Sequence, residues 1–147
     1  MCLSWLDEQV REGQVAIDYG CGSGVLAVAA VKLGARAAYA FDIDPQALTA
    51  TRDNAAANQV SDRVHVVESD DALPRDADIL LANILCGPLC ELAPRFAELT
   101  APGGKIVLAG LLDTQAAEVT RAHSAWFDIS PFATRDGWTA LSGTRRR

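Results

Sequence analysis

The heptapeptide DYGCGSG, residues 18–24, joins a short apolar run (QVAIDY, residues 14–19) to an Ala/Val/Leu-rich stretch (residues 24–34). The apolar run predicts a buried β-strand and the Ala/Val/Leu-rich stretch an α-helix. Glycines between a strand and a helix allow unusual backbone angles and let a ligand approach the main chain closely. We therefore expect a ligand crevice at this turn, in preference to a tight turn without a ligand.

The alternation of strand and helix continues along the rest of the chain. It predicts strands at residues 36–42, 63–68, 77–83 and 105–110, helices at 44–58, 88–99 and 114–125, and a turn at 101–104. Two weaker strand candidates, 126–132 and 137–143, have no helix between them and predict an antiparallel hairpin at one edge. The expected fold is one α/β domain over residues 1–147, with a mostly parallel, Rossmann-like sheet.

Composition excludes several function classes. Half of the 147 residues are hydrophobic, which is typical of a packed domain, and the net charge of −6 argues against direct nucleic-acid binding. No apolar run is long enough to cross a membrane, and the N-terminus lacks the basic and cleavage regions of a secretory signal. We expect a protein of the cytoplasm.

The four cysteines are too few for a disulfide scaffold. Cys86 and Cys90 are four residues apart and share a helix face if that segment is helical. His65 and His123 do not complete a zinc-binding spacing with them. The sequence therefore predicts no metal site, and buried thiols instead.

The spacing of the glycines indicates which nucleotide the crevice holds. Gly20 and Gly22 fit the dinucleotide pattern G-x-G-x-x-G/A, but Val25 occupies its last position and the third glycine is Gly24. Asp18 would repel a pyrophosphate, whereas it suits the ammonium and sulfonium charges of S-adenosylmethionine. We expect S-adenosylmethionine, bound by Asp18, Gly20 and Gly22, and keep a nicotinamide-dependent oxidoreductase as the alternative.

Acidic and amide side chains follow the other predicted strands. Asp42 ends the second strand, roughly 20 residues beyond the glycines, where a carboxylate accepts ribose hydroxyls. Asp44 competes for that role, but its place before a proline predicts a helix N-cap. Asn83 ends the fourth strand beside the expected crevice, and is either a ligand contact or a turn residue. Asp70 and Asp71 follow the third strand, where an acid could meet an adenine amino group, but we interpret them in preference as solvated loop acids.

Four segments carry a family resemblance: IDYGCGSGVLAVAAVKLGA, AFDIDPQAL, NAAANQV and ANILCGPLCELAP. Together they resemble the PrmA family of ribosomal protein methyltransferases, which modify the large-subunit protein L11. The glycine loop is generic to methyltransferases, while the run from Asn83 to Pro94 is much more specific. The similarity extends from Leu3 to the final GWTALSGTR segment, nearly the whole chain.

The resemblance implies the seven-stranded class I methyltransferase sheet with an antiparallel last strand. It implies that Gly20, Asp42 and Asn83 contact S-adenosylmethionine. The reaction implied is methyl transfer to lysine side chains and an N-terminal amine of L11. The residues indicate no convincing general base, so no side chain is assigned to proton transfer.

Two features of the family have no counterpart in these residues. The family carries an N-terminal domain that recognises the ribosomal protein, and a cofactor-contacting threonine just upstream of the helix that begins here at Met1. We therefore expect the catalytic half of a longer protein, either a fragment or a product of alternative initiation. A cofactor-binding remnant without activity stays open as a non-enzyme alternative.

Overall fold

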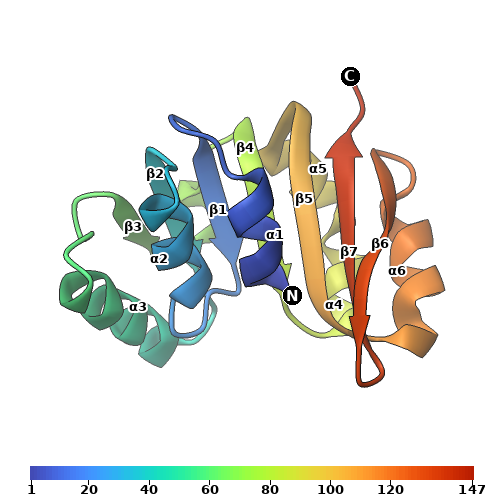
Figure 1. The fold of residues 1–147 in the computed structure, drawn as a ribbon, viewed down its shortest axis with the longest axis horizontal. Helices are drawn as coiled ribbons and strands as arrows, with labels where there is room; N and C mark the ends of the chain where they lie inside the picture. The colour runs from blue at the N-terminus through green and yellow to red at the C-terminus, as the bar shows by residue number, and fades with distance from the viewer.

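The computed structural model describes the whole chain, residues 1–147, as a seven-stranded sheet between two layers of helices (Figure 1). The strand order is β3-β2-β1-β4-β5-β7-β6, and the first five strands are parallel. The strands are β1 (Val15–Tyr19), β2 (Ala37–Phe41), β3 (Val64–Val67), β4 (Ala77–Asn83), β5 (Thr100–Leu112), β6 (Phe127–Arg135) and β7 (Trp138–Arg145). The expected mostly parallel sheet with an antiparallel edge hairpin is confirmed.

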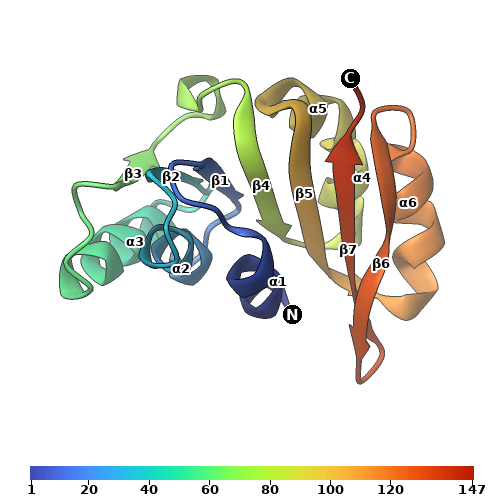
Figure 2. The ribbon, with the colours of Figure 1, turned by 45° about the horizontal axis from the view of Figure 1, so that its top comes forward.

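Three helices cover each face of the sheet, which buries both sides of the central strands (Figures 1 and 2). One layer contains α1 (Cys2–Gln9), α2 (Val25–Lys32) and α3 (Pro45–Ala57). The other contains α4 (Cys86–Glu91), α5 (Ala93–Leu99) and α6 (Ala116–His123); η1 (Asp70–Ala72) and η2 (Asp113–Gln115) are short 3-10 turns. No helix is both long and apolar enough to pass through a bilayer.

The strand order reverses between β1 and β4, the two central strands. After β1 the chain moves outward to β2 and β3, then returns to the other side of β1 to form β4. The helices that follow β1 and β4 lie on opposite faces, so a crevice opens beyond the carboxyl ends of these strands. The fold thus brings the residues after Tyr19 and Asn83 to one place.

The hairpin of β6 and β7 closes one side of the sheet. Both pairings of β7 are antiparallel, and β6 is left at the edge. The β6–β7 register shifts between Pro131 and Ala133, so the edge strand carries an irregularity at its centre. The Asp136-Gly137 turn has positive φ at both residues, which is the geometry of a tight hairpin.

The helix predicted at residues 88–99 is two helices. α4 ends at Glu91 and α5 begins at Ala93, with Leu92 between them. Pro94 explains the break, because proline has no N–H to donate to the carbonyl of Cys90, four residues earlier, and its ring clashes with that carbonyl, whereas proline is tolerated in the first turn of α5. One continuous helix was therefore the wrong prediction.

The turn predicted at residues 101–104 lies inside strand β5. Ala77 pairs with Thr100 and Ile79 with Lys105, so four residues of β5 stand opposite one residue of β4. Gly103 has φ +81° in this irregular stretch. The segment changes direction as expected, but it does so as an insertion within the strand.

Candidate functional site

The glycine loop connects β1 to α2 and folds back on the end of β2. Gly20, Gly22 and Gly24 have φ values of +75°, +54° and +82°, which residues with a side chain rarely adopt. The amides of Gly20 and Cys21 both donate to the carbonyl of Phe41, at 2.7 and 2.9 Å. The loop is therefore fixed to the carboxyl end of the neighbouring strand.

Two of these glycines are also required by close packing. A Cβ at Gly20 would lie 2.4 Å from Ile84 Cγ2, and one at Gly24 would lie 2.6 Å from Thr51 Cγ2. A Cβ at Gly22 would meet nothing within 4 Å. Gly22 therefore faces open space, where a ligand has room beside the backbone.

Side chains of α3 hold the carbonyl groups of the loop. Thr51 Oγ1 donates to the carbonyl of Gly22 at 3.0 Å, and Asn54 Nδ2 donates to that of Ser23 at 2.7 Å. Because its carbonyls are already bonded to α3, the loop is preorganised and its amides are positioned without a ligand.

Asp42 lies directly after β2 and ties the loop to the start of α3. Its Oδ2 accepts the amide of Gly22 at 2.9 Å, and its Oδ1 accepts that of Asp44 at 3.0 Å. Asp44 in turn caps α3, with Oδ1 accepting the amide of Gln46 at 2.9 Å. The predicted helix cap at Asp44 is confirmed, and Asp42 is left as the acid beside the loop.

Asp18 is only 2% exposed, although it lies at the end of β1 and lines the crevice. Its Oδ2 accepts the amide of Ala27 at 3.1 Å, in the first turn of α2. The pKa of Asp18 is raised to about 7, chiefly by burial; the hydrogen bond from the Ala27 amide opposes the shift, and the nearby charge of Asp42 adds a smaller upward contribution. A cation in the crevice would stabilise the ionised form of Asp18.

Two hollows flank the glycine loop. The first encloses about 720 Å³, and its walls include Asp18, Gly20, Asn83, Leu85 and Trp138. The second encloses about 670 Å³ beyond the ends of β2 and β3, and Asp42 is part of its wall. Gly22 lines the first hollow, so its hydrogen bond to Asp42 lies between the two. Each volume is within the range of small-molecule sites.

Comparison with known proteins identifies the family. The family model described as "Ribosomal protein L11 methyltransferase (PrmA)" matches residues 1–146. The chain belongs to the ribosomal protein L11 methyltransferase family. A relative of that name from Pseudomonas paraeruginosa is 52% identical over 147 residues, and one from Shewanella amazonensis is 50% identical. Each match covers 99% of this chain and 50% of the relative. The chain spans about half the length of these relatives.

Solved structures agree with this assignment. A ribosomal protein L11 methylase from Lactobacillus delbrueckii subsp. bulgaricus superimposes with a TM-score of 0.91 at 26% identity, over 99% of this chain and 77% of the other. An RNA methyltransferase from Salinibacter ruber, solved in complex with S-adenosyl-L-homocysteine, shares the fold at a TM-score of 0.75 and 22% identity, over 99% and 90%. Because the family is one of methyltransferases, the comparisons do not favour the nicotinamide-dependent alternative.

The fourth strand brings Asn83 to the first hollow of this family member. Asn83 is exposed at the end of β4, opposite Ala109 of β5. The adjoining backbone is tightly packed, because a Cβ at Gly110 would lie 2.3 Å from the carbonyl oxygen of Ile84. The structure therefore places Asp18, Gly20, Gly22 and Asn83 around one hollow, with Asp42 across the loop.

The reading of Asp70 as a solvated loop acid was wrong. Asp70 accepts a hydrogen bond from the hydroxyl of Tyr19 and one from the Arg95 guanidinium at 2.6 Å, and it lines the second hollow. Burial, and next the bond to Asp70, raise the pKa of Tyr19. This group connects the end of β1 to α5, whereas Asp71 is exposed.

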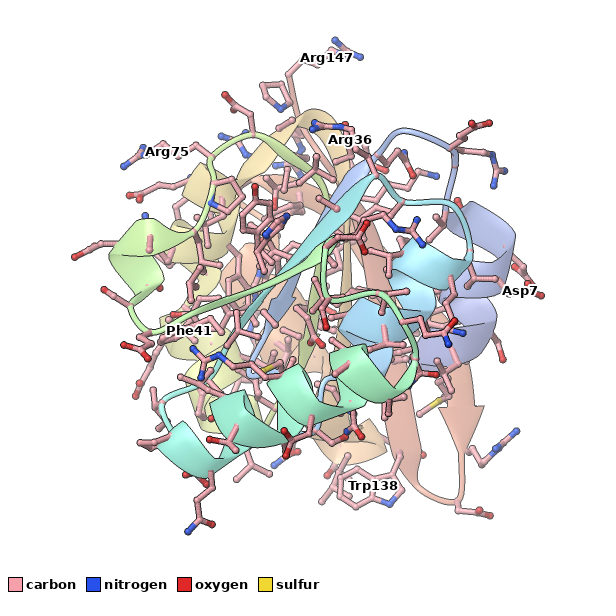
Figure 3. All side chains as sticks on the ribbon, turned by 90° about the vertical axis from the view of Figure 1, so that its left-hand side faces the viewer. Asp7, Arg36, Phe41, Arg75, Trp138 and Arg147 are labelled. Atoms are coloured by element: carbon pink, nitrogen blue, oxygen red, sulfur yellow. The ribbon has the colours of Figure 1, made fainter.

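Sequence reasoning missed an apolar rim around the first hollow. Leu3, Val25, Leu85 and Trp138 are all among its lining residues and are between 46% and 71% exposed. They come from four separate segments of the chain, so no local pattern groups them. Figure 3 shows Trp138 at the end of the molecule opposite Arg147. The only sequence signal was the Trp in the GWTALSGTR segment of the resemblance.

Proposed function

We propose that this domain binds S-adenosylmethionine and transfers its methyl group to amino groups of ribosomal protein L11, on lysine side chains and the N-terminus. The observation that carries the proposal is the pair of hollows joined across the glycine loop by Asp42, with the buried acid Asp18 in the wall of one. Family membership supports the same reaction. We place this activity in the cytoplasm.

The residues fit the methyl donor group by group. Asp42 has two carboxylate oxygens beside the second hollow, which suits a ribose with two adjacent hydroxyls. Ile43 and Leu48 line the same hollow and offer apolar contacts to an adenine ring. In the first hollow Asp18 supplies negative charge for the ammonium group, and Gly20 and Gly22 leave space beside the backbone. When bound, the cofactor supplies a methyl group on a positively charged sulfur, open to in-line displacement.

The walls of the first hollow then act on the incoming amine. The amine must be neutral to react, and an ordinary lysine with a pKa near 10.4 is only about 0.04% neutral at pH 7. Leu85 and Trp138 replace water around it, and desolvation lowers an amine pKa. We assign to the Asn83 side-chain oxygen a hydrogen bond from the cofactor or from the incoming amine, which orients that group. These residues contribute positioning and electrostatics, and no side chain is assigned as a general base.

The experiment begins with isothermal titration of the domain with S-adenosylmethionine, S-adenosylhomocysteine and NAD. We expect saturable binding of the first two and none of NAD. Incubation with unmodified L11 and a limiting concentration of labelled methyl donor then measures transfer, with Asp42→Ala as the control whose cofactor binding is weakened. Saturable binding of NAD, without binding of S-adenosylmethionine, would overturn the assignment of S-adenosylmethionine as the cofactor. Tight cofactor binding without any transfer, even with the family's N-terminal half supplied, would favour the inactive remnant.

A further inference from the structure

Three potential metal ligands meet between α4 and α6, outside both hollows. The sulfur atoms of Cys86 and Cys90 and a carboxylate oxygen of Glu118 all lie within 4.8 Å of one another. Cys86 Sγ is 3.7 Å from Glu118 Oε2, which accepts its S–H group. We propose that these three side chains bind one soft divalent cation of the Zn²⁺ class, contrary to the prediction of no metal site, because the fold brings Glu118 from a distant segment to the two cysteines.

The donor set matches the chemistry of such a cation. Zinc in proteins is bound by thiolates at about 2.3 Å and by carboxylate oxygens at about 2.0–2.2 Å, usually in a tetrahedron. Two thiolates favour a soft or borderline metal over Mg²⁺ or Ca²⁺, which prefer oxygen ligands alone. Three protein ligands leave the fourth position to water.

The packing of the two helices brings the ligands together. Cys86 and Cys90 are one helical turn apart on α4, so their side chains share a face. Leu89 of α4 and Val119 of α6 are fully buried in the same core cluster. His123 Nε2 lies 2.9 Å from the carbonyl oxygen of Leu89, which fixes the far end of α6 against α4. Glu118 is thereby held opposite the two sulfurs.

Access and charge also suit a cation. Glu118 is exposed and Cys90 only partly buried, so an ion reaches the cluster from solvent. Two thiolates, one carboxylate and a divalent cation carry a net charge of −1. Without a metal, burial and then Cys86 raise the pKa of Cys90 to about 11, and the positive charge of Arg121, one turn beyond Glu118, opposes this shift. Binding of the cation converts two thiols to thiolates and releases two protons to solvent, so atoms and charge are conserved.

The test uses chelator-treated, reduced protein titrated with Co²⁺ and then with Zn²⁺. We expect one Co²⁺ per chain, with thiolate-to-metal charge-transfer absorption that one equivalent of Zn²⁺ abolishes. Removing an outer partner of a metal ligand already lowers affinity about 10- to 100-fold. Cys86→Ser, Cys90→Ser and Glu118→Gln should therefore each weaken Zn²⁺ binding at least about 100-fold, whereas Glu91→Gln and Cys2→Ser should not.

Calorimetry in two buffers of different ionisation enthalpy adds a second measurement. Each thiol loses its proton when it binds the metal, so at pH 7 about two protons should leave per Zn²⁺ bound. Circular dichroism checks that the variants fold, and Glu118→Gln changes an exposed side chain, so this variant is expected to fold even if a cysteine variant does not. Absence of saturable Co²⁺ or Zn²⁺ binding would overturn the proposal, as would unchanged affinity in both Cys90→Ser and Glu118→Gln.

Discussion

The Asp42 carboxylate accepts the backbone amide of Gly22 at 2.9 Å, across the boundary between the two hollows. The same side chain also accepts the amide of Asp44, so one residue sets the position of the glycine loop and of the start of α3. Any ligand that spans both hollows must pass this carboxylate.

Replacing Asp42 should therefore weaken cofactor binding. A charge-assisted hydrogen bond contributes roughly 1.5–3 kcal/mol, so Asp42→Ala should lower the affinity for S-adenosylmethionine roughly 10- to 150-fold by calorimetry. Asp44→Ala is the matched control. It removes a helix cap and should lower the free energy of unfolding by about 1 kcal/mol with little change in affinity. If the two variants exchanged these effects, the role given to Asp42 would be wrong.

The close packing of Ile84 on Gly20 predicts that a side chain at position 20 destabilises the fold by a clash. This clash can be measured separately from the strain of positive φ. Gly20→Ala and Gly137→Ala both place a Cβ at positive φ, and this strain should lower the free energy of unfolding by roughly 1–2 kcal/mol in each variant. Only Gly20→Ala also forces a Cβ against Ile84, and overpacking adds about 1–3 kcal/mol. Chemical denaturation should show the larger loss for Gly20→Ala. Adding Ile84→Ala should reduce the excess, and strictly additive losses would argue against the contact.

The pKa of Asp18 predicts a stability that falls as pH rises. The carboxyl has a pKa of about 7 when folded and 3.8 otherwise, so between these values the folded chain holds the extra proton. The free energy of unfolding should then decrease from pH 4 to pH 7, by up to about 4 kcal/mol at 1.36 kcal/mol per pKa unit. Denaturation across this range measures the trend. In Asp18→Asn the free energy of unfolding should change less with pH. An equal slope in that variant would assign the effect to other groups.

Cofactor affinity should have the opposite pH dependence. Ionised Asp18 attracts the ammonium group, so the affinity for S-adenosylmethionine should rise from pH 6 toward pH 7.5. Titration at each pH, with proton uptake or release recorded, measures this. Asp18→Asn should bind more weakly and lose most of the rise. A wild-type affinity that is constant over this range would contradict a contact between Asp18 and the ammonium group.

Substrate methylation should depend on residues beyond this domain. The curated relatives are about twice as long, and remote binding energy orients a protein substrate at the reacting atoms. We expect L11 to be methylated far faster by a fusion carrying the N-terminal half of the Pseudomonas paraeruginosa relative than by residues 1–147 alone. Labelled methyl incorporation compares the two, with Asp42→Ala in the fusion as the background. Equal rates would show that recognition lies within the domain.

Local patterns were enough to predict the strands, most of the helices and the cap at Asp44. Each depends on neighbouring residues, such as the apolar run of β4 or the proline after Asp44. The gathering of Asp18, Asp42 and Asn83 near the glycine loop could be predicted because the ends of parallel strands meet at one edge of a sheet. Pro94 also indicated the break between α4 and α5, but the helical pattern on both sides of it favoured one continuous helix.

Contacts between distant segments could not be predicted from one sequence. Nothing near Gly20 indicates that Ile84 packs on it, and nothing near Gly22 points to Thr51. Asp70 looked solvated because its partners, Tyr19 and Arg95, are 51 and 25 residues away. These contacts depend on how each helix packs against the sheet. That packing is set by the volumes of side chains that are far apart in the sequence.

The irregular edge strand β6 has a consequence for pairing with other chains. A free strand edge is a template for adding another chain through backbone hydrogen bonds. Pro131 has no N–H to offer, and the register shift beside it interrupts the row of unpaired groups. Backbone pairing of a further strand along the whole length of β6 is thereby disfavoured.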